Sequence, residues 1–163
     1  MRILGIDPGS AATGYGVIES RAGRLQHLAH GILRPPRGES LAARLAAIHR
    51  GVLALIDRHA PERAVVEQVF VAASPRAALV LGQARGAALA AVAAAGLPVD
   101  EVSPREVKQA LVGTGAADKQ QVQEMVRQLL ALEARPPQVA ADALGAAICR
   151  AHQGVLAGLG RGA

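Results

Sequence analysis

The first nine residues constrain the fold of this chain more than any other stretch. Residues 3–6 are apolar apart from one glycine and are typical of a short buried strand, which Asp7-Pro8-Gly9 ends abruptly. An extended pattern resumes over residues 13–18. Asp followed by Pro is ordinary turn chemistry, so a plain β-hairpin would explain this stretch. A carboxylate at the mouth of a buried strand is nevertheless costly unless another group pairs with it.

A second acid, Glu67, occupies the same kind of position, because it closes the apolar strand predicted for residues 64–66. If the two strands are parallel neighbours, Asp7 and Glu67 lie side by side at one edge of the sheet, where open α/β sheets place their chemistry. Two adjacent carboxylates repel each other, and the usual remedy is a divalent cation with oxygen ligands. A third acid, Asp142, falls in the first turns of a predicted last helix, where it also suits the helix dipole.

The rest of the pattern predicts strands first and helices later. Strands are expected at residues 2–7, about 13–20 and about 25–34, and apolar residues spaced at three and four predict a helix from Leu41 until Ala60-Pro61 breaks it. The pattern then predicts, in order, a strand ending at Glu67, a helix from Ser74-Pro75 to about Ala95, a strand at 99–102, and helices over about 104–112, after Asp118, and about 138–157. This order describes a mixed sheet of five strands covered by helices, an α/β fold.

Composition limits the class of protein. At 163 residues the chain is expected to form one domain over residues 1–163, with its last few residues as a flexible tail. Aromatic residues make up 1% of the chain and hydrophobic residues 51%, so the core must consist of Ala, Leu, Val and Ile. The formal charge of +5 favours a polyanionic partner, although the basic residues are scattered arginines rather than a run.

Three features predict a cytoplasmic protein without a membrane segment. The single cysteine, Cys149, excludes an internal disulfide and a cysteine metal cluster, as expected in a reducing cytosol. Asp7-Pro8 interrupts the only early apolar run, so no signal peptide is visible. The longest uncharged stretch, Gly86 to Val99, is too short to span a bilayer.

Gly82 and Gly86 are four residues apart in a helical pattern, which indicates that another element packs closely there.

Two lysines carry independent information. Lys119 falls in the first turn of its predicted helix, where a cation opposes the positive end of the helix dipole. A helix start is instead an anion site, so Lys119 would strengthen the attraction to a phosphate there. Lys108, just before the turn at residues 113–115, could reach the same ligand. The alternative is that both lysines are simply solvated.

Six blocks of the sequence, in one order, carry a resemblance to a known family. The blocks are Gly5-Ile6-Asp7-Pro8-Gly9-Ser10 with residues 13–18, Glu67-Gln68-Val69-Phe70, Leu81-Gly82-Gln83-Ala84-Arg85-Gly86, Val107-Lys108-Gln109 with residues 112–115, Asp118-Lys119-Gln120-Gln121-Val122-Gln123 with Met125-Val126, and Ala140-Ala141-Asp142-Ala143-Leu144. Together they resemble the RuvC family of bacterial Holliday junction resolvases. The resemblance covers about residues 1 to 152 without a large gap.

That resemblance implies an RNase H-like fold working as a homodimer, with one active site per subunit. Each site would nick one of two opposed strands of a four-way (Holliday) DNA junction during recombination and repair, leaving 5′-phosphate and 3′-hydroxyl ends. In the family, carboxylates matching Asp7, Glu67 and Asp142 bind Mg²⁺ or Mn²⁺, and the expected mechanism is two-metal phosphodiester hydrolysis. The expected protein partner is the RuvA–RuvB branch-migration complex.

The resemblance also assigns residues that contact DNA. Residues matching Lys108 and Lys119 lie near the scissile phosphate, as catalytic and DNA-binding groups. Phe70, the only phenylalanine, matches a residue that stacks on junction bases. Arg76 is a further DNA-binding candidate, although the stretch 72–76 lacks the lysine–asparagine pair expected after the phenylalanine.

One departure from the family pattern leaves an alternative function open. The family usually carries another acid, or a histidine, three residues before the acid matched by Asp142, which places both side chains on one helix face. Here that position is Val139, and neighbouring Gln138 is neutral. The alternative is therefore a dimer that binds junctions with weak or no cleavage. A second alternative, an actin-like ATPase fragment with the same Gly-Ile-Asp-x-Gly opening, would need two related domains, and this chain has room for one.

Overall fold

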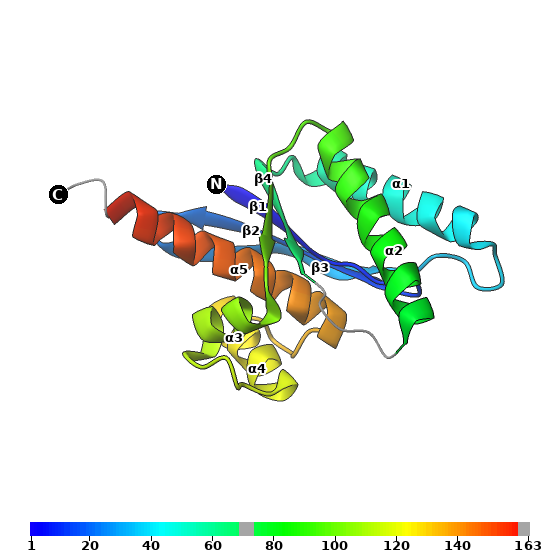
Figure 1. Ribbon diagram of the computed structural model, residues 1–163. Helices are drawn as coiled ribbons and strands as arrows, with labels where there is room; N and C mark the ends of the chain where they lie inside the picture. The colour runs from blue at the N-terminus through cyan, green and yellow to red at the C-terminus, as the bar shows by residue number, and fades with distance from the viewer. Residues whose placement is uncertain (69–73, 160–163) are drawn as a thin grey trace.

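A mixed five-stranded sheet forms the centre of the molecule (Figure 1). The computed structural model describes residues 1–68 and 74–159, with side chains up to residue 154, so the expected tail lies largely outside it. In the spatial order β3-β2-β1-β4-β5, the strands are β3 (Arg24–Leu33), β2 (Thr13–Arg21), β1 (Arg2–Asp7), β4 (Arg63–Glu67) and β5 (Val99–Val102). β2 is antiparallel to β1 and β3, whereas β4 is parallel to β1 and β5. The prediction of a mixed five-stranded sheet is confirmed.

Helices cover both faces of this sheet (Figure 1). They are α1 (Leu41–His59), α2 (Pro75–Ala94), α3 (Pro104–Val112), α4 (Lys119–Leu129) and α5 (Gln138–Leu159). α1 and α2 lie on one side, and α5 crosses the other side with α3 and α4 packed beneath it. These bounds lie within a few residues of those predicted, because serine and aspartate caps mark the helix starts in the sequence.

Strand alternation divides the core into two layers, one on each face. Ile3 and Val65 point toward α3, α4 and α5, whereas Leu4 and Val66 point toward α1 and α2. Both layers consist of aliphatic side chains, as the composition requires. Because side chains alternate, the odd-numbered residues Asp7 and Glu67 share the face on which α5 lies.

The start of α5 rests directly on the β1–β2 hairpin. A Cβ atom added to Gly14 would lie 1.9 Å from the carbonyl oxygen of Val139, and one added to Gly5 would lie 1.9 Å from that of Ala143. Only glycine allows the helix backbone to approach the strands so closely. This contact brings Asp142 to the end of β1 where Asp7 lies.

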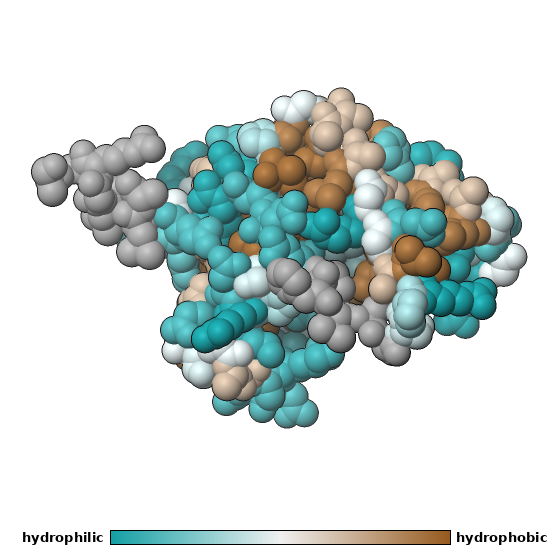
Figure 2. Space-filling model, in the orientation of Figure 1, coloured by the Kyte–Doolittle hydropathy of each residue, from teal (hydrophilic) through white to brown (hydrophobic). Residues whose placement is uncertain are grey.

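α2 presents an apolar face that no other described element covers. Leu79 is 70% exposed, and a Cβ added to Gly82 or Gly86 would meet no atom within 4 Å. The expectation that another element of the chain packs against these glycines is therefore wrong for the residues that the structure describes. In Figure 2 apolar surface gathers on the side of α1 and α2, whereas hydrophilic surface dominates over α3 and α4.

Among the described helices, α2 is also the one long and apolar enough to cross a membrane by length and composition alone. Only 22% of its most apolar 18-residue window is buried in this fold. Packing into the core of this chain therefore does not account for the apolar composition of α2. Arg85, in the middle of the helix, makes an ion pair with Glu101 of β5. A charge held there by the sheet is unfavourable inside a bilayer.

Candidate active site

Three acids converge at the carboxyl end of the parallel strands. Asp7 ends β1 and Glu67 ends β4, and the pairing of Ile6 with Val66 places the two acids side by side. Asp142 reaches them from the second turn of α5. One carboxylate oxygen from each residue lies within 4.8 Å of the others, and all three residues are half-buried.

The turn after Asp7 is fixed by local hydrogen bonds. The Thr13 hydroxyl donates to the Gly9 carbonyl at 2.9 Å and accepts from the Gly9 N–H at 3.3 Å, and Thr13 is fully buried. Arg44 of α1 donates to the Ser10 carbonyl at 2.8 Å. These contacts hold the end of β1 in place, so Asp7 belongs to a rigid element rather than to a loose loop.

Burial and mutual repulsion disfavour the ionised forms of these acids. Burial, and then the neighbouring Asp142, raises the pKa of Asp7 to about 7. Burial, and then the charges of Asp7 and Asp142, raises the pKa of Glu67 to about 8. Burial also raises the pKa of Asp142, although Lys119, Lys108 and the nearby Gln138 amide act in the opposite direction. Such a cluster gains free energy from any cation that enters it.

The two lysines predicted from the sequence lie near this cluster. Lys119 is the first residue of α4, directly after the N-cap Asp118, and Lys108 lies in α3. Their charges lower the pKa of Glu67 and Asp142. Among the residues that the structure describes, neither lysine makes an ion pair with the three acids. The lysines therefore leave the acids only partly neutralised.

Of the two other DNA-binding candidates, Phe70 and Arg76, the structure describes only Arg76. Phe70 lies outside the described residues. Arg76 is exposed in the first turn of α2, and it lines a hollow of about 390 Å³ together with Ser10 of the β1–β2 turn. The structure therefore brings Arg76 to the end of the sheet that carries Asp7.

A basic hollow beside the same turn was not predicted. Its volume is about 490 Å³, and its charged lining residues are three arginines, Arg34, Arg37 and Arg44, and one acid, Glu39. In the sequence these arginines belong to a loop and to the following helix, and only the folded chain gathers them. The pair of arginines that flanks Pro35-Pro36 was the one available signal.

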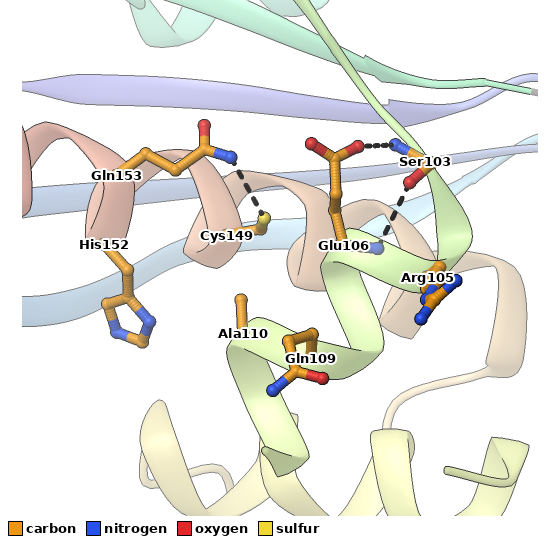
Figure 3. A pocket seen from close by; sticks show the side chains of 8 residues that line it. All are labelled: Ser103, Arg105, Glu106, Gln109, Ala110, Cys149, His152 and Gln153. Carbon is orange, nitrogen blue, oxygen red and sulfur yellow. Dashed lines mark hydrogen bonds between the residues drawn. The ribbon is translucent and has the colours of Figure 1, made fainter. Parts of the chain in front are cut away.

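A cavity of about 560 Å³ between α3 and α5 is a separate feature (Figure 3). Its polar groups serve the local structure: the Ser103 N–H donates to Glu106 at 2.7 Å in the capping box of α3, and Gln153 contacts the Cys149 sulfur at 3.9 Å. Burial, and then Glu106, raises the pKa of Cys149 to about 11, so this thiol stays protonated and unreactive. None of the three acids or two lysines lines this cavity.

Sequence comparison decides the family. Residues 3–150 match the family described as Crossover junction endodeoxyribonuclease RuvC. The chain belongs to the RuvC family. RuvC of Burkholderia vietnamiensis is 53% identical over 154 residues, which cover 94% of this chain and 85% of that protein. RuvC of Alkalilimnicola ehrlichii is 55% identical over 152 residues, covering 93% and 92% of the two chains.

Solved structures agree with this assignment. Thermus thermophilus RuvC in complex with a Holliday junction substrate superposes with a TM-score of 0.90 at 36% identity, covering 96% of both chains. The yeast mitochondrial Holliday junction resolvase Ydc2, at 14% identity and a TM-score of 0.68, shares the fold alone. The fold is therefore RNase H-like, as the resemblance implied. RuvC proteins are metal-dependent nucleases, hydrolases of phosphodiester bonds, and the chain carries a matching acidic cluster.

Proposed function

We propose that the chain is an endonuclease that resolves four-way DNA junctions by paired nicks in opposed strands. The observation that carries this proposal is the convergence of three carboxylates, within 4.8 Å, at the sheet edge of a RuvC-family chain. The junction substrate is supported by the Thermus thermophilus relative, which was solved with a Holliday junction. Cleavage would yield 5′-phosphate and 3′-hydroxyl ends that a ligase can seal, during recombination and repair.

The acids fit Mg²⁺ or Mn²⁺ as the cation. All three offer carboxylate oxygens, which hard divalent ions prefer, and none of them forms an ion pair with a basic side chain among the residues that the structure describes. Asp7, Glu67 and Asp142 would hold the metal, two ions per site. When bound, such ions would supply activation of the attacking water and stabilisation of the leaving 3′ oxygen.

The lysines and arginines suit the DNA backbone. Lys119 stands at the N-terminus of α4, where backbone N–H groups also attract an anion, and we assign Lys119 and Lys108 to the scissile phosphate. Arg76 and the basic hollow of Arg34, Arg37 and Arg44 flank the turn after Asp7 and would contact phosphates on either side. Phe70 is kept as a base-stacking candidate on the family resemblance.

Paired nicks need two active sites, and the exposed face of α2 supports a homodimer. Leu79, Gly82 and Gly86 form an uncovered apolar strip on which a second copy could pack at short distance. By family resemblance we also propose a cytoplasmic location, no membrane attachment, and the RuvA–RuvB complex as a partner.

The alternative, a dimer that binds junctions without cutting, is motivated by Val139 alone. The comparisons favour the nuclease, because the curated relatives are named as endonucleases over nearly the whole chain. Val139 removes one ligand position but leaves the three-acid cluster intact.

A cleavage assay on a synthetic four-way junction tests the proposed function. The chain should nick two opposed strands of the junction in Mg²⁺ or Mn²⁺, and should leave a linear duplex of the same sequence uncut. Resealing by DNA ligase checks the chemistry of the ends. A tight gel shift without nicks under either metal would instead favour the binding-only dimer, and cleavage gained by Val139→Asp would identify the missing ligand as the cause.

A further inference from the structure

The first residue of α5 carries a polar group that makes no well-formed hydrogen bond to the residues that the structure describes. The Nε2 atom of Gln138 is buried, and none of the described residues accepts a hydrogen bond of full geometry from it. Native structures satisfy nearly all buried polar side-chain atoms, because an unsatisfied one is destabilising. The exceptions usually have an explanation, such as a catalytic role or a bound ion.

The position of Gln138 directs this group at the acidic cluster. Gln138 precedes Asp142 by four residues in α5, so the two side chains lie on one helix face. Its amide acts as a hydrogen-bond donor toward Asp142 and favours the ionised form of that carboxyl, although the contact falls short of full hydrogen-bonding geometry. The amide is therefore only loosely paired with the carboxylate.

Two contacts fix the backbone at the start of α5. The carbonyl of Val139 lies against Gly14 of β2. Gln123 of α4 donates to the Pro136 carbonyl at 3.2 Å, just before the helix begins. Val139 itself offers no ligand atom. These contacts hold the start of α5, and with it Gln138 and Asp142, against β2 and α4.

We propose that the side-chain oxygen of Gln138 supplies the divalent-cation ligand that Val139 lacks, so that three carboxylates and one amide form the metal centre. Glutamine is one methylene longer than aspartate, which lets it reach the cluster from one residue earlier in the helix. Amide oxygens are ordinary ligands of hard divalent ions. A half-turn of the amide exchanges Oε1 and Nε2, so the same side chain can face Asp142 with its N–H₂ group or a cation with its oxygen.

This inference rests on the proposed function, because it assumes a metal at the acidic cluster. It goes further in assigning the fourth ligand to a neutral group. A neutral ligand adds no repulsion to the three acids but attracts a cation less than a carboxylate would. The chain should therefore bind Mn²⁺ more weakly than a variant with an acid at the same position.

The test is a calorimetric titration of Mn²⁺ into the full chain without DNA. Gln138→Met keeps the length of the side chain but removes its oxygen, and should weaken Mn²⁺ binding by about 10-fold. Gln138→Glu should bind Mn²⁺ more tightly than the natural chain. Gln26→Ala, an exposed glutamine change on β3, is the matched control and should bind like the natural chain.

Two further measurements separate a ligand from a structural residue. The metal-free melting temperature of Gln138→Met should be equal to or above that of the natural chain, because an unsatisfied amide is replaced by an apolar group. Adding Val139→Asp to Gln138→Met should restore Mn²⁺ affinity. Unchanged affinity in Gln138→Met, or a failure of Val139→Asp to restore it, would overturn the proposal for Gln138. Unchanged affinity in Asp7→Asn would instead remove the metal centre itself.

Discussion

Two carboxylate regions lie toward opposite ends of the same two elements, β4 and α5, and they are built in opposite ways. Arg63 begins β4 and Arg150 lies far along α5, and both bind one oxygen of Asp100, at 2.6 Å and 2.7 Å. Glu67 ends β4 and Asp142 lies near the start of α5, where both face another acid rather than an arginine.

The difference in partners sets the charge state of each region. Burial alone would raise the pKa of Asp100, but hydrogen bonds from Arg63 and Arg150 hold it below its ordinary value. At the acidic cluster the pKa values of Asp7 and Glu67 rise to about 7 and about 8. One region is neutralised by the chain itself and serves the fold. The other is left deficient in positive charge, which suits a site that takes its cation from solution.

The largest expected effect is a contrast in cleavage rate between Asp7→Asn in one region and Asp100→Asn in the other. Asp7→Asn should lower junction cleavage by on the order of 10³-fold or more, because the site loses a metal ligand, while junction binding is retained. Asp100→Asn should leave cleavage unchanged, since its partners are arginines of the fold. Gel shifts and nicking rates on one junction measure both. Cleavage retained by Asp7→Asn would remove this acid from the mechanism.

The two regions should also respond to pH in different ranges. In the metal-free chain Asp7 and Glu67 have folded-state pKa values of about 7 and about 8, above their ordinary values of 3.8 and 4.5. The unfolded chain therefore loses these protons first, and the free energy of unfolding should fall as the pH rises from about 4 to about 8. The loss should be roughly 3–5 kcal/mol, because protonation of one acid relieves its neighbour.

Asp100 should act in the opposite direction and at lower pH. Because the pKa of Asp100 is lowered in the folded chain, its ionised form adds to the free energy of unfolding when the pH is above the pKa of the unfolded chain. This contribution is lost as the pH falls through the folded pKa, below about 4. Urea unfolding across this pH range, in EDTA and in Mg²⁺, measures both regions. Mg²⁺ should flatten the slope between pH 4 and pH 8, and a slope equal in the two buffers would contradict a cation at the acidic cluster.

The acids of the site could be predicted largely because they belong to strand ends. Asp7 and Glu67 follow apolar strands, so their shared sheet edge followed from the pattern of strands and helices. The family resemblance, rather than its helix position, singled out Asp142. The arginine pair around Asp100 could not be predicted, because Arg150 is 50 residues away from Asp100 and only the packing of α5 joins them.

Close packing and missing partners were likewise invisible in the sequence. A glycine pattern does not say whether the neighbouring element belongs to the same chain. α5 packs against Gly14, whereas none of the described residues packs against Gly86. Gln138 looked like a neutral neighbour of Val139 until the fold buried its amide beside Asp142. Both facts depend on which helix face meets the sheet, and that is decided by tertiary contacts.

A smaller effect is expected from moving the start of α5 while leaving the arginine pair in place. Gly14→Ala would place a Cβ 1.9 Å from the Val139 carbonyl oxygen, so the helix must shift away from the strand. We expect a loss of roughly 2–3 kcal/mol in the free energy of unfolding, together with slower cleavage, because Asp142 moves with the helix. Urea unfolding and nicking rates measure the two losses. Full stability and full activity in this variant would show that the close contact does not position Asp142.

The smallest expected effect is on the free energy of unfolding, which Asp7→Asn and Asp100→Asn should change in opposite directions. Without metal, Asp7→Asn should stabilise the chain, because it removes a carboxylate that burial and Asp142 oppose. Asp100→Asn should destabilise it by about 1 kcal/mol or less, since it leaves Arg63 and Arg150 facing each other at a partly exposed site, and added salt should reduce this loss. Asp57→Asn, a change at an exposed position of α1, should do neither. Removing a charge that stabilises the fold lowers the free energy of unfolding, whereas removing a charge that only a bound cation would neutralise does not. If both substitutions shifted the urea midpoint in the same direction, the two regions would differ only in degree.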